Sequence, residues 1–230
     1  MELEKVTRRA ESSVAGDKRR YADACGTAHA LELIGDRWTL LVLRELMLGA
    51  RRFSELRGDL PGISANVLTQ RLAELEQRGL VRRRKLPPPA SVQVYEATTW
   101  GLEAEPIVQA LGRWAARSPG HDPTLPISGV SILLSFRTMI SEKRAKGVDA
   151  RIGFRFGPDD YVARIKKGQI RIARGPLDEC DVVFSGPPAA LAAVVYGGQL
   201  LDLMGVTGER ALAEKFTTLF VLPSKVGVDG

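Results

Sequence analysis

The sequence contains very few of the residues that hold small folds together covalently or through metals. Cysteine occurs twice, as Cys25 and Cys180, and histidine occurs twice, as His29 and His121. The two cysteines are far apart and no CxxC pair is present, so a structural disulfide or zinc site is not expected. Two histidines are too few for most metal sites. The sequence therefore predicts neither a metal nor another cofactor.

Long apolar segments and catalytic motifs are absent as well. No segment approaches the roughly 18 uninterrupted apolar residues that a membrane span needs. Residues 1–20 are charged throughout and lack the apolar core of a signal peptide. These features predict a cytoplasmic protein that does not contact a membrane. No GxSxG, HExxH or Walker motif is present and the carboxylates are scattered, so we predict that the protein is not an enzyme.

What the sequence does contain is a concentrated basic segment. The chain has 230 residues, a net charge of +6 and a pI of about 9.5. Residues 51–85 hold nine Lys or Arg and four Asp or Glu, so most of the net charge lies in this short stretch. Such clustering is typical of a surface that binds double-stranded DNA.

Residues 53–79 of the same region are patterned as two helices joined by a tight turn. Ser64 is suited to cap a helix over 65–78, and Gly79 is suited to end it. Ile63 and Leu68 are spaced as a hydrophobic staple. Within the second helix, one apolar stripe recurs with helical spacing, made of Leu68, Leu72 and Leu75. This stripe predicts the buried side.

The opposite side of this helix carries amides and small residues. An ordinary amphipathic hairpin is one interpretation. The other is a helix in the DNA major groove, where Asn and Gln can pair with adenine edges. On that interpretation the base contacts are made by Asn66, Thr69 and Gln70, with Ser64 at the helix start.

A basic hairpin follows the two helices and favours the DNA interpretation. Residues 80–86 and 92–97 are strand-like, and 87–90 form a Pro-rich tip. A helix pair followed by such a hairpin is a winged helix-turn-helix, in which the wing grips phosphates or the minor groove. The predicted phosphate contacts are Arg51, Arg52, Arg71, Arg82, Arg83, Arg84 and Lys85. Arg71 lies nearer the buried stripe, so an internal salt bridge is its alternative role.

Three further helices complete this first domain. They are predicted at 24–34, at 37–48 with Asp36 as the cap, and from Thr98 or Thr99 to about 117. Pro106 should kink the last helix or mark a later start. The last helix has a broad apolar face that one small domain cannot bury. We therefore predict a homodimer, with two recognition helices on successive major grooves.

The second half differs in composition and predicts an α+β domain. Residues 118–126 combine Pro, Gly and polar residues, which is typical of a linker. Beyond it, strand patterns come first and helices mostly later over 127–223, predicting one antiparallel sheet covered on one face. Residues 1–20 are predicted to be a mobile arm, and 224–230 a tail. The fold class is thus α+β, with a winged helix-turn-helix domain at 21–117.

Residues 21–117 resemble the HxlR-type winged helix-turn-helix regulators of bacteria. The motifs are IGDRWTLLVLREL, RRFSEL and PGISANVLTQRLAELEQRGLV, followed by a closing helix with Trp114. The resemblance implies a dimeric DNA-binding regulator, with recognition helix 64–78, wing 82–95 and dimerisation through the terminal helices. TTWG at 98–101 departs from the family pattern at the start of the last helix.

The resemblance also implies a role for Cys25. Some HxlR-type regulators use a cysteine near this position to sense oxidants or electrophiles. A helix N-terminus lowers the pKa of a thiol and raises its reactivity. The alternative is a small buried residue near the dimer contact.

The second half resembles the sterol carrier protein type 2-like fold. The matching features are a Lys-Gly hairpin at 167–168, CDVVFSGPPAALAAVVYG and GVTGERALAEKF. The resemblance implies an apolar tunnel for hydrophobic molecules. Its expected lining is Phe136, Phe154, Phe156, Phe184, Phe216 and Phe220, although each ring could simply fill a core.

Three functions follow from these patterns. The first is a transcriptional regulator controlled by a small apolar effector in the second domain. The second is a regulator that senses through Cys25. The third is a carrier of apolar molecules that uses the winged domain for dimerisation. The basic segment at 51–85 favours the first over the carrier.

Overall fold

A computed structural model describes residues 21–227, so the predicted arm at 1–20 lies outside the described residues. The chain divides into two compact units at residue 36, and each is described by itself. In the first unit, α1 spans Gly26–Ile34 and Cys25 occupies its N-cap position. The helix begins two residues later than predicted, so Cys25 precedes its first turn.

The second unit begins with α2 (Thr39–Glu45), which is shorter than the predicted helix over 37–48. The N-cap residue is Trp38, whose φ of 78° is left-handed, and not Asp36. A left-handed residue cannot be part of an α-helix, so the helix cannot extend back to residue 37. Beyond Glu45, the chain tightens: the Leu46 N–H binds the Leu43 carbonyl, three residues earlier.

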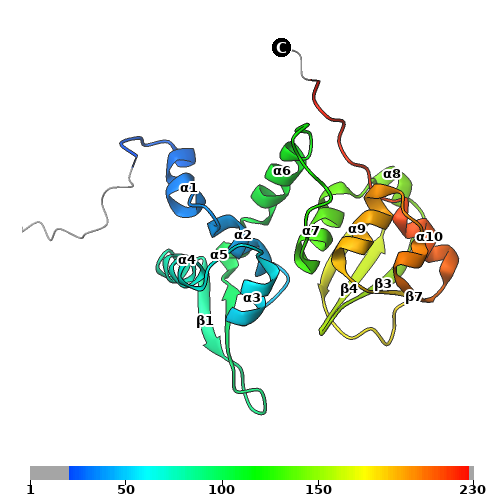
Figure 1. Cartoon of the computed structure of the whole chain (residues 1–230), viewed down its shortest axis with the longest axis horizontal. Helices are drawn as coiled ribbons and strands as arrows, with labels where there is room; N and C mark the ends of the chain where they lie inside the picture. Colours follow the sequence, from blue (N-terminus) through cyan, green and yellow to red (C-terminus); the bar gives the residue numbers. More distant parts are fainter. Residues whose placement is uncertain (1–20, 228–230) are drawn as a thin grey trace, which may run out of the picture. The chain divides into compact units, whose positions relative to one another are not determined.

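The helix-turn-helix and the wing form where the sequence predicts them. α3 spans Phe53–Asp59 and α4 spans Ala65–Gln77. Gly79 has a φ of 72°, the left-handed conformation expected at a helix end. β1 (Val81–Lys85) and β2 (Gln93–Ala97) pair as an antiparallel hairpin (Figure 1).

The last helix of this domain is divided in two. α5 (Thr99–Leu102) is capped by the Thr98 hydroxyl, which accepts from the Gly101 N–H. α6 (Glu105–Ala115) then begins one residue before Pro106, so the proline marks a later start. A side chain at Gly101 would place its Cβ 2.1 Å from the Leu80 carbonyl oxygen. The glycine of TTWG is therefore required by a close backbone approach.

The second half contains a five-stranded sheet in the order β5-β4-β3-β6-β7. Its strands are β3 (Ala150–Phe156), β4 (Asp159–Lys166), β5 (Gln169–Arg174), β6 (Val182–Ser185) and β7 (Gly205–Gly208). β3 and β6 are parallel, so the sheet is mixed and the prediction of a purely antiparallel sheet is wrong. The segment between β5 and β6 contains no helix or strand. It carries the chain from the edge strand β5 back across the sheet, so that β6 lies beside β3 and runs parallel to it.

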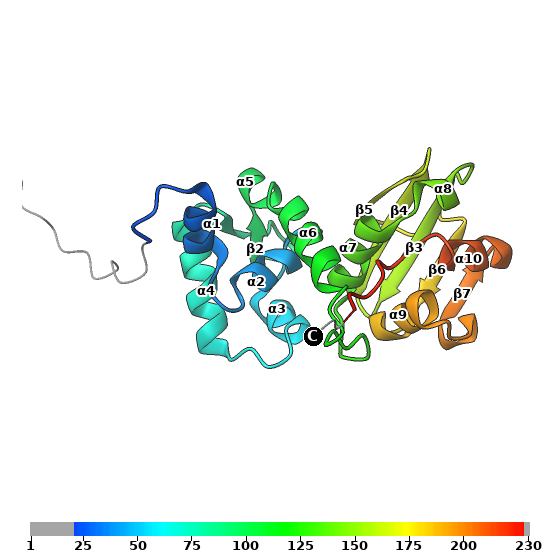
Figure 2. The ribbon, with the colours of Figure 1, turned by 90° about the horizontal axis from the view of Figure 1, so that it is seen from above.

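Helices cover one face of this sheet (Figure 2). They are α7 (Gly129–Met139), α9 (Pro188–Gly197) and α10 (Arg210–Thr217), with the short α8 (Glu142–Ala145) and the 3₁₀ turn η2 (Leu201–Leu203). Residues alternate along β4 and β5 between buried and more exposed, as expected for a sheet covered on one side, whereas β3 buries 152–154 in succession. The one-face prediction is confirmed.

The six phenylalanines of this half fill the space between sheet and helices. Each is at most 7% exposed. Phe136 stacks on Phe220 with ring centroids 4.4 Å apart, and Phe154 stacks on Phe184 at 5.9 Å. Phe216 contacts Phe136, Phe154, Phe184 and Phe220. The rings occupy the interior themselves, and Phe156 also lines a cavity, so a ligand tunnel lined by all six stays a prediction.

α7 contributes to both halves of the second unit. It contacts α2 and α6 of the winged domain, and β5 and α9 of the C-terminal domain. Eight of its eleven residues are buried, Val130 and Phe136 among them. Ser128 caps it and donates a hydrogen bond of 2.8 Å to the buried Glu45 of α2. The two domains are therefore packed against a shared helix.

Candidate DNA-binding surface

The surface is built on α4, whose orientation is set by its buried stripe. Leu68, Leu72 and Leu75 are at most 1% exposed. Ser64 starts the helix, and its hydroxyl accepts from the Val67 N–H at 3.3 Å. With one side held in the core, the opposite side faces outward. The exposed residues there are Asn66, Thr69, Gln70, Ala73 and Gln77.

The polar side chains on this outer side are only lightly engaged. The Thr69 hydroxyl donates to the Ala65 carbonyl one turn earlier, at 2.9 Å. The Gln70 amide donates to Glu74 at 3.0 Å, which leaves its carbonyl oxygen on the exposed surface. These are local bonds on one helix that a DNA base edge can replace.

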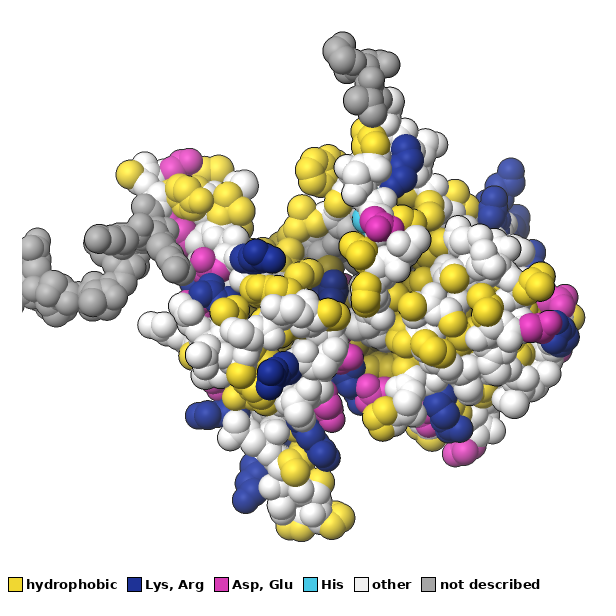
Figure 3. Space-filling view, in the orientation of Figure 1, with side chains coloured by type: hydrophobic (Ala, Val, Ile, Leu, Met, Phe, Trp, Pro, Cys, Tyr) yellow, Lys and Arg dark blue, Asp and Glu magenta, His cyan; other side chains and the backbone are white. Residues whose placement is uncertain are grey.

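The wing presents its basic residues to solvent. Four basic residues of β1 are exposed, namely Arg82, Arg83, Arg84 and Lys85. Figure 3 shows basic side chains along the wing. Arg82 and Arg84 each bind Glu96 of β2 at 2.6 Å. Partial burial alone would raise the pKa of Glu96, but the bonds from Arg84 and Arg82 lower it overall. Glu96 is therefore an anion that offsets part of the wing's positive charge.

This geometry agrees with comparisons to known proteins. A profile of the HxlR-like helix-turn-helix family matches residues 33–122. The HTH-type transcriptional regulator YvaP of Bacillus subtilis is 36% identical over 86 residues, which make up 37% of this chain and 80% of YvaP. The chain belongs to the HxlR-like helix-turn-helix family. Its first half is accordingly the DNA-binding region of a transcriptional regulator.

Other family members cover similar shares of the chain. The HTH-type regulator sll1512 of Synechocystis is 38% identical over 87 residues, which make up 38% of this chain and 64% of sll1512. The chain thus spans less than two thirds of the length of this relative. The reduced form of the regulator YodB from B. subtilis is 33% identical, with a TM-score of 0.39 over 44% of this chain and 100% of that one. The family profile ends at residue 122, before the C-terminal domain.

Two of the predicted phosphate contacts of this HxlR-like chain are instead internal. Arg51 is 2% exposed and forms ion pairs with Asp59 and with Asp159 of the C-terminal domain. Arg71 is 7% exposed and pairs with Glu74 at 2.9 Å, the alternative that the sequence left open. A buried guanidinium that is already paired cannot reach a phosphate. Arg52, by contrast, is exposed and stays a candidate.

The Arg51 cluster is the part of the structure that the sequence pattern missed. The Arg51 guanidinium lies between Asp59, at 2.7 Å, and Asp159, which also binds Arg174 at 2.9 Å. Burial alone would lower the pKa of Arg51, but Tyr161 and the two carboxylates raise it overall, so the arginine stays charged. Asp159 is 108 residues away from Arg51 in the chain, and no local motif connects the two.

Cys25 is exposed at the N-cap of α1. Hydrogen bonds from the backbone of Thr27 and then Ala28 lower the pKa of its thiol. Its alternative role, as a small residue buried near a dimer contact, stays a prediction.

Within residues 21–227, no helix is long and apolar enough to cross a membrane. The same part of the chain contains no group of three His, Cys, Asp or Glu side chains that could hold a metal ion.

Proposed function

We propose that this protein is a sequence-specific, dimeric transcriptional regulator that responds to a small molecule. One observation carries the proposal: the exposed amide side of α4 lies beside a wing with four exposed basic residues. We assign base reading to Asn66, Thr69 and Gln70, with Ser64 at the helix start. Phosphate binding is assigned to Arg52 and the wing residues Arg82, Arg83, Arg84 and Lys85. No catalytic activity is proposed.

The exposed apolar face of α6 supports dimerisation. Ile107 is 46% exposed, Leu111 44% and Trp114 73%, and no residue of α6 is buried. Large apolar side chains gathered on one helix of a soluble protein usually mark an interface. We assign this face to contact with a second copy of the chain, because a dimer would place two α4 helices on one DNA site.

The base-reading role is tested by two substitutions on the same DNA. A preferred site is first selected from random duplexes with the wild-type protein, and affinities are then measured by fluorescence anisotropy. Gln70→Ala should weaken binding to the selected site by about tenfold, or about 1.4 kcal/mol, and leave random DNA unaffected. Arg83→Ala should weaken both and reduce the salt slope by about one charge.

Arg171→Ala is the matched control, because Arg171 is an exposed arginine of β5 in the other domain. It should change neither affinity. Equal losses on selected and random DNA for Gln70→Ala would contradict base reading by that residue. No selected site at all would contradict a sequence-specific regulator.

Dimerisation is tested by sedimentation equilibrium of the full chain. Leu111→Glu places a charge in the middle of the apolar face of α6, and burying it without a partner is strongly unfavourable. The wild type should be dimeric and the variant monomeric at the same concentration. A monomeric wild type would contradict the dimer.

For the C-terminal domain we propose a sterol-carrier-like fold that serves the regulator as its effector-responsive part. The mixed sheet with helices on one face supports this proposal. The packed phenylalanines do not support an open tunnel, and no observation favours a carrier function.

A second candidate is a regulator that senses oxidants or electrophiles through Cys25. The exposed N-cap position and the lowered thiol pKa favour it, because the thiolate is the reactive form. Cys25→Ser should abolish any change in DNA affinity that diamide causes. A variant that responds as the wild type does would exclude Cys25 as the sensor.

A further inference from the structure

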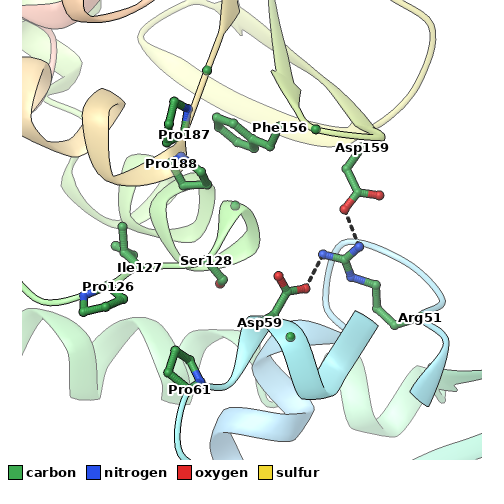
Figure 4. A pocket seen from close by; sticks show the side chains of 14 residues that line it. Arg51, Asp59, Pro61, Pro126, Ile127, Ser128, Phe156, Asp159, Pro187 and Pro188 are labelled. Atoms are coloured by element: carbon green, nitrogen blue, oxygen red, sulfur yellow. Dashed lines mark hydrogen bonds and ion pairs between the residues drawn. The ribbon is translucent and has the colours of Figure 1, made fainter. Parts of the chain in front are cut away.

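A cleft lies where the winged domain meets the C-terminal domain (Figure 4). Its volume is about 450 Å³, within the range of small-molecule sites. The end of α3 and the turn after it form one side, with Asp59 and Pro61. Three segments of the C-terminal domain form the other, at 126–129, 156–159 and 186–188.

The walls of this cleft are mostly apolar and rich in rings. Rings and one aliphatic side chain line it, namely Pro61, Pro126, Ile127, Phe156, Pro187 and Pro188. Four glycines, at 58, 129, 157 and 186, add no side-chain bulk. Such walls suit a planar apolar body more than an extended polar chain.

The polar groups of the cleft gather at one end. Figure 4 shows the Arg51 guanidinium between the carboxyl groups of Asp59 and Asp159. Both oxygens of Asp159 are engaged, one by Arg51 and the other by Arg174. Asp59 binds Arg51 through Oδ2, and within residues 21–227 its Oδ1 has no hydrogen bond from the protein. The Asp59 side chain is 27% exposed, so a molecule in the cleft can reach it.

The charges decide what kind of molecule fits. Three carboxylates surround the two arginines at this end, because Glu55 also lies 4.0 Å from Arg51, and the group still open to a ligand is an acceptor oxygen of Asp59. An anion would meet that carboxylate, which is unfavourable in a partly buried site. A cation or an uncharged N–H donor would be bound. Burial raises the pKa of Asp59, with Arg51 opposing, so a cationic partner also relieves the unfavourable burial of its charge.

We propose that this cleft is the effector site of the protein, and that it binds a flat, mostly apolar molecule whose N–H group, neutral or singly positive, bonds to Asp59. This proposal rests on the proposed function of a small-molecule-responsive regulator. It places the effector between the domains and not among the phenylalanines of the C-terminal core.

Arg51 gives this site a connection to the DNA-binding surface. Its backbone N–H donates to the Tyr95 carbonyl, and its carbonyl accepts from the Tyr95 N–H, both at 2.8 Å. Tyr95 belongs to β2 of the wing. An N–H donor on Oδ1 shares the negative charge of Asp59 with Arg51 and so weakens the bond that Arg51 makes to Oδ2, which changes the anchoring of the residue that joins the wing to the C-terminal domain. Different affinities for the two arrangements then couple ligand binding to DNA binding.

The test uses benzamidine, a planar ring with a cationic N–H fork, and benzoate, the same ring with a carboxylate. Both are titrated into the ¹⁵N-labelled full chain without DNA. Benzamidine should shift the amide signals of residues 58–59, 127–129 and 156–159 with saturation in the millimolar range, and benzoate should not. Asp59→Asn should weaken benzamidine binding by about tenfold.

Ile127→Trp should block the cleft by adding bulk to its wall, and so abolish benzamidine binding. Gln169→Trp is the matched control, because this exposed residue lies at the opposite end of β4 and β5 from Asp159. If Asp59→Asn does not fold, the two tryptophan variants decide. Equal shifts with benzoate, or benzamidine binding that survives Ile127→Trp, would overturn the proposal.

Coupling is measured separately, as the affinity for selected DNA with and without saturating benzamidine. A change of about fivefold or more is expected in the wild type and none in Ile127→Trp. Cleft binding without DNA binding would contradict the proposed regulator and leave the cleft site standing. DNA binding without cleft binding would contradict the cleft site alone. Binding of both without coupling would overturn the effector role.

Discussion

Arg51 and Arg52 are adjacent, but Arg51 forms internal ion pairs and Arg52 is exposed on the surface. Substituting each one separately distinguishes an effect on stability from an effect on DNA binding. Arg51 is 2% exposed and balances two carboxylates. Arg51→Met keeps most of the volume but leaves Asp59 and Asp159 without this partner. Breaking a buried ion pair from one side lowers stability by about 3–5 kcal/mol, so the free energy of unfolding in urea should fall by about 3 kcal/mol.

Arg52→Met is the control for this loss. Arg52 is exposed and pairs only loosely with Glu55, at 3.7 Å. Its substitution should change stability by less than about 0.5 kcal/mol, while DNA affinity falls at low salt. If the Arg51→Met protein is as stable as the wild type but binds DNA more weakly, Arg51 contacts DNA and its internal role is contradicted.

Glu45 provides a pH prediction. It is fully buried, and burial raises its pKa, opposed by Arg44 and then by the hydrogen bond from Ser128. A carboxyl group whose pKa is raised in the folded state contributes stability below its unfolded pKa of 4.5, and this contribution is lost as the pH rises through the folded value. The variant Glu45→Gln has no such proton to lose.

The wild type should therefore lose stability relative to Glu45→Gln as the pH is raised from 4 toward 8. Urea unfolding of both proteins at each pH gives this difference, in which other titrating groups cancel. A difference that is independent of pH would show that Glu45 is not the titrating group.

At the scale of elements, the wing contains its own countercharge. Glu96 binds both Arg82 and Arg84 at 2.6 Å, and these bonds hold it as an anion. Glu96→Gln removes this charge and releases the two arginines toward phosphates. Affinity for selected and random DNA should rise together, by a few fold at about 0.1 M salt, with a steeper salt dependence. Fluorescence anisotropy over a salt series measures both effects.

Glu103→Gln serves as the comparison, because Glu103 is an exposed glutamate between α5 and α6. It should raise affinity much less. A Glu96→Gln protein with unchanged or weaker DNA binding would indicate that Glu96 positions the arginines for DNA.

The elements that the sequence predicts well are those with local signals. Ser64 and Gly79 mark the ends of α4, and the Leu68 stripe marks its buried side. β7 was missed because its GVTG sequence has a single apolar residue and no alternation. The internal role of Arg51 was missed for another reason. It depends on a partner that is distant in the chain, and periodicity carries no information about it.

At the scale of the whole molecule, the second unit is held together across its two domains by α7 and by polar connections, three of which join side chains. Arg51 binds Asp159, Glu45 accepts from Ser128, and Arg137 of α7 binds Glu105 of α6 at 2.6 Å. The chain also contains separate probes for each half. All three Trp lie in the first half, and six of the seven Phe lie in the second.

These connections predict cooperative unfolding of the wild type. Tryptophan fluorescence and the ¹⁹F signals of incorporated 4-fluorophenylalanine should change at the same urea concentration. In Asp159→Asn/Arg137→Met, which lacks both ion pairs between the domains, the two transitions should separate. Arg164→Met removes an exposed ion pair within the C-terminal domain and should keep the two transitions together.

Separate transitions in the wild type would show that the domains unfold independently. Coincident transitions in the double variant would assign the coupling to the contacts that both substitutions leave in place, namely the Ser128–Glu45 hydrogen bond and the apolar packing of α7.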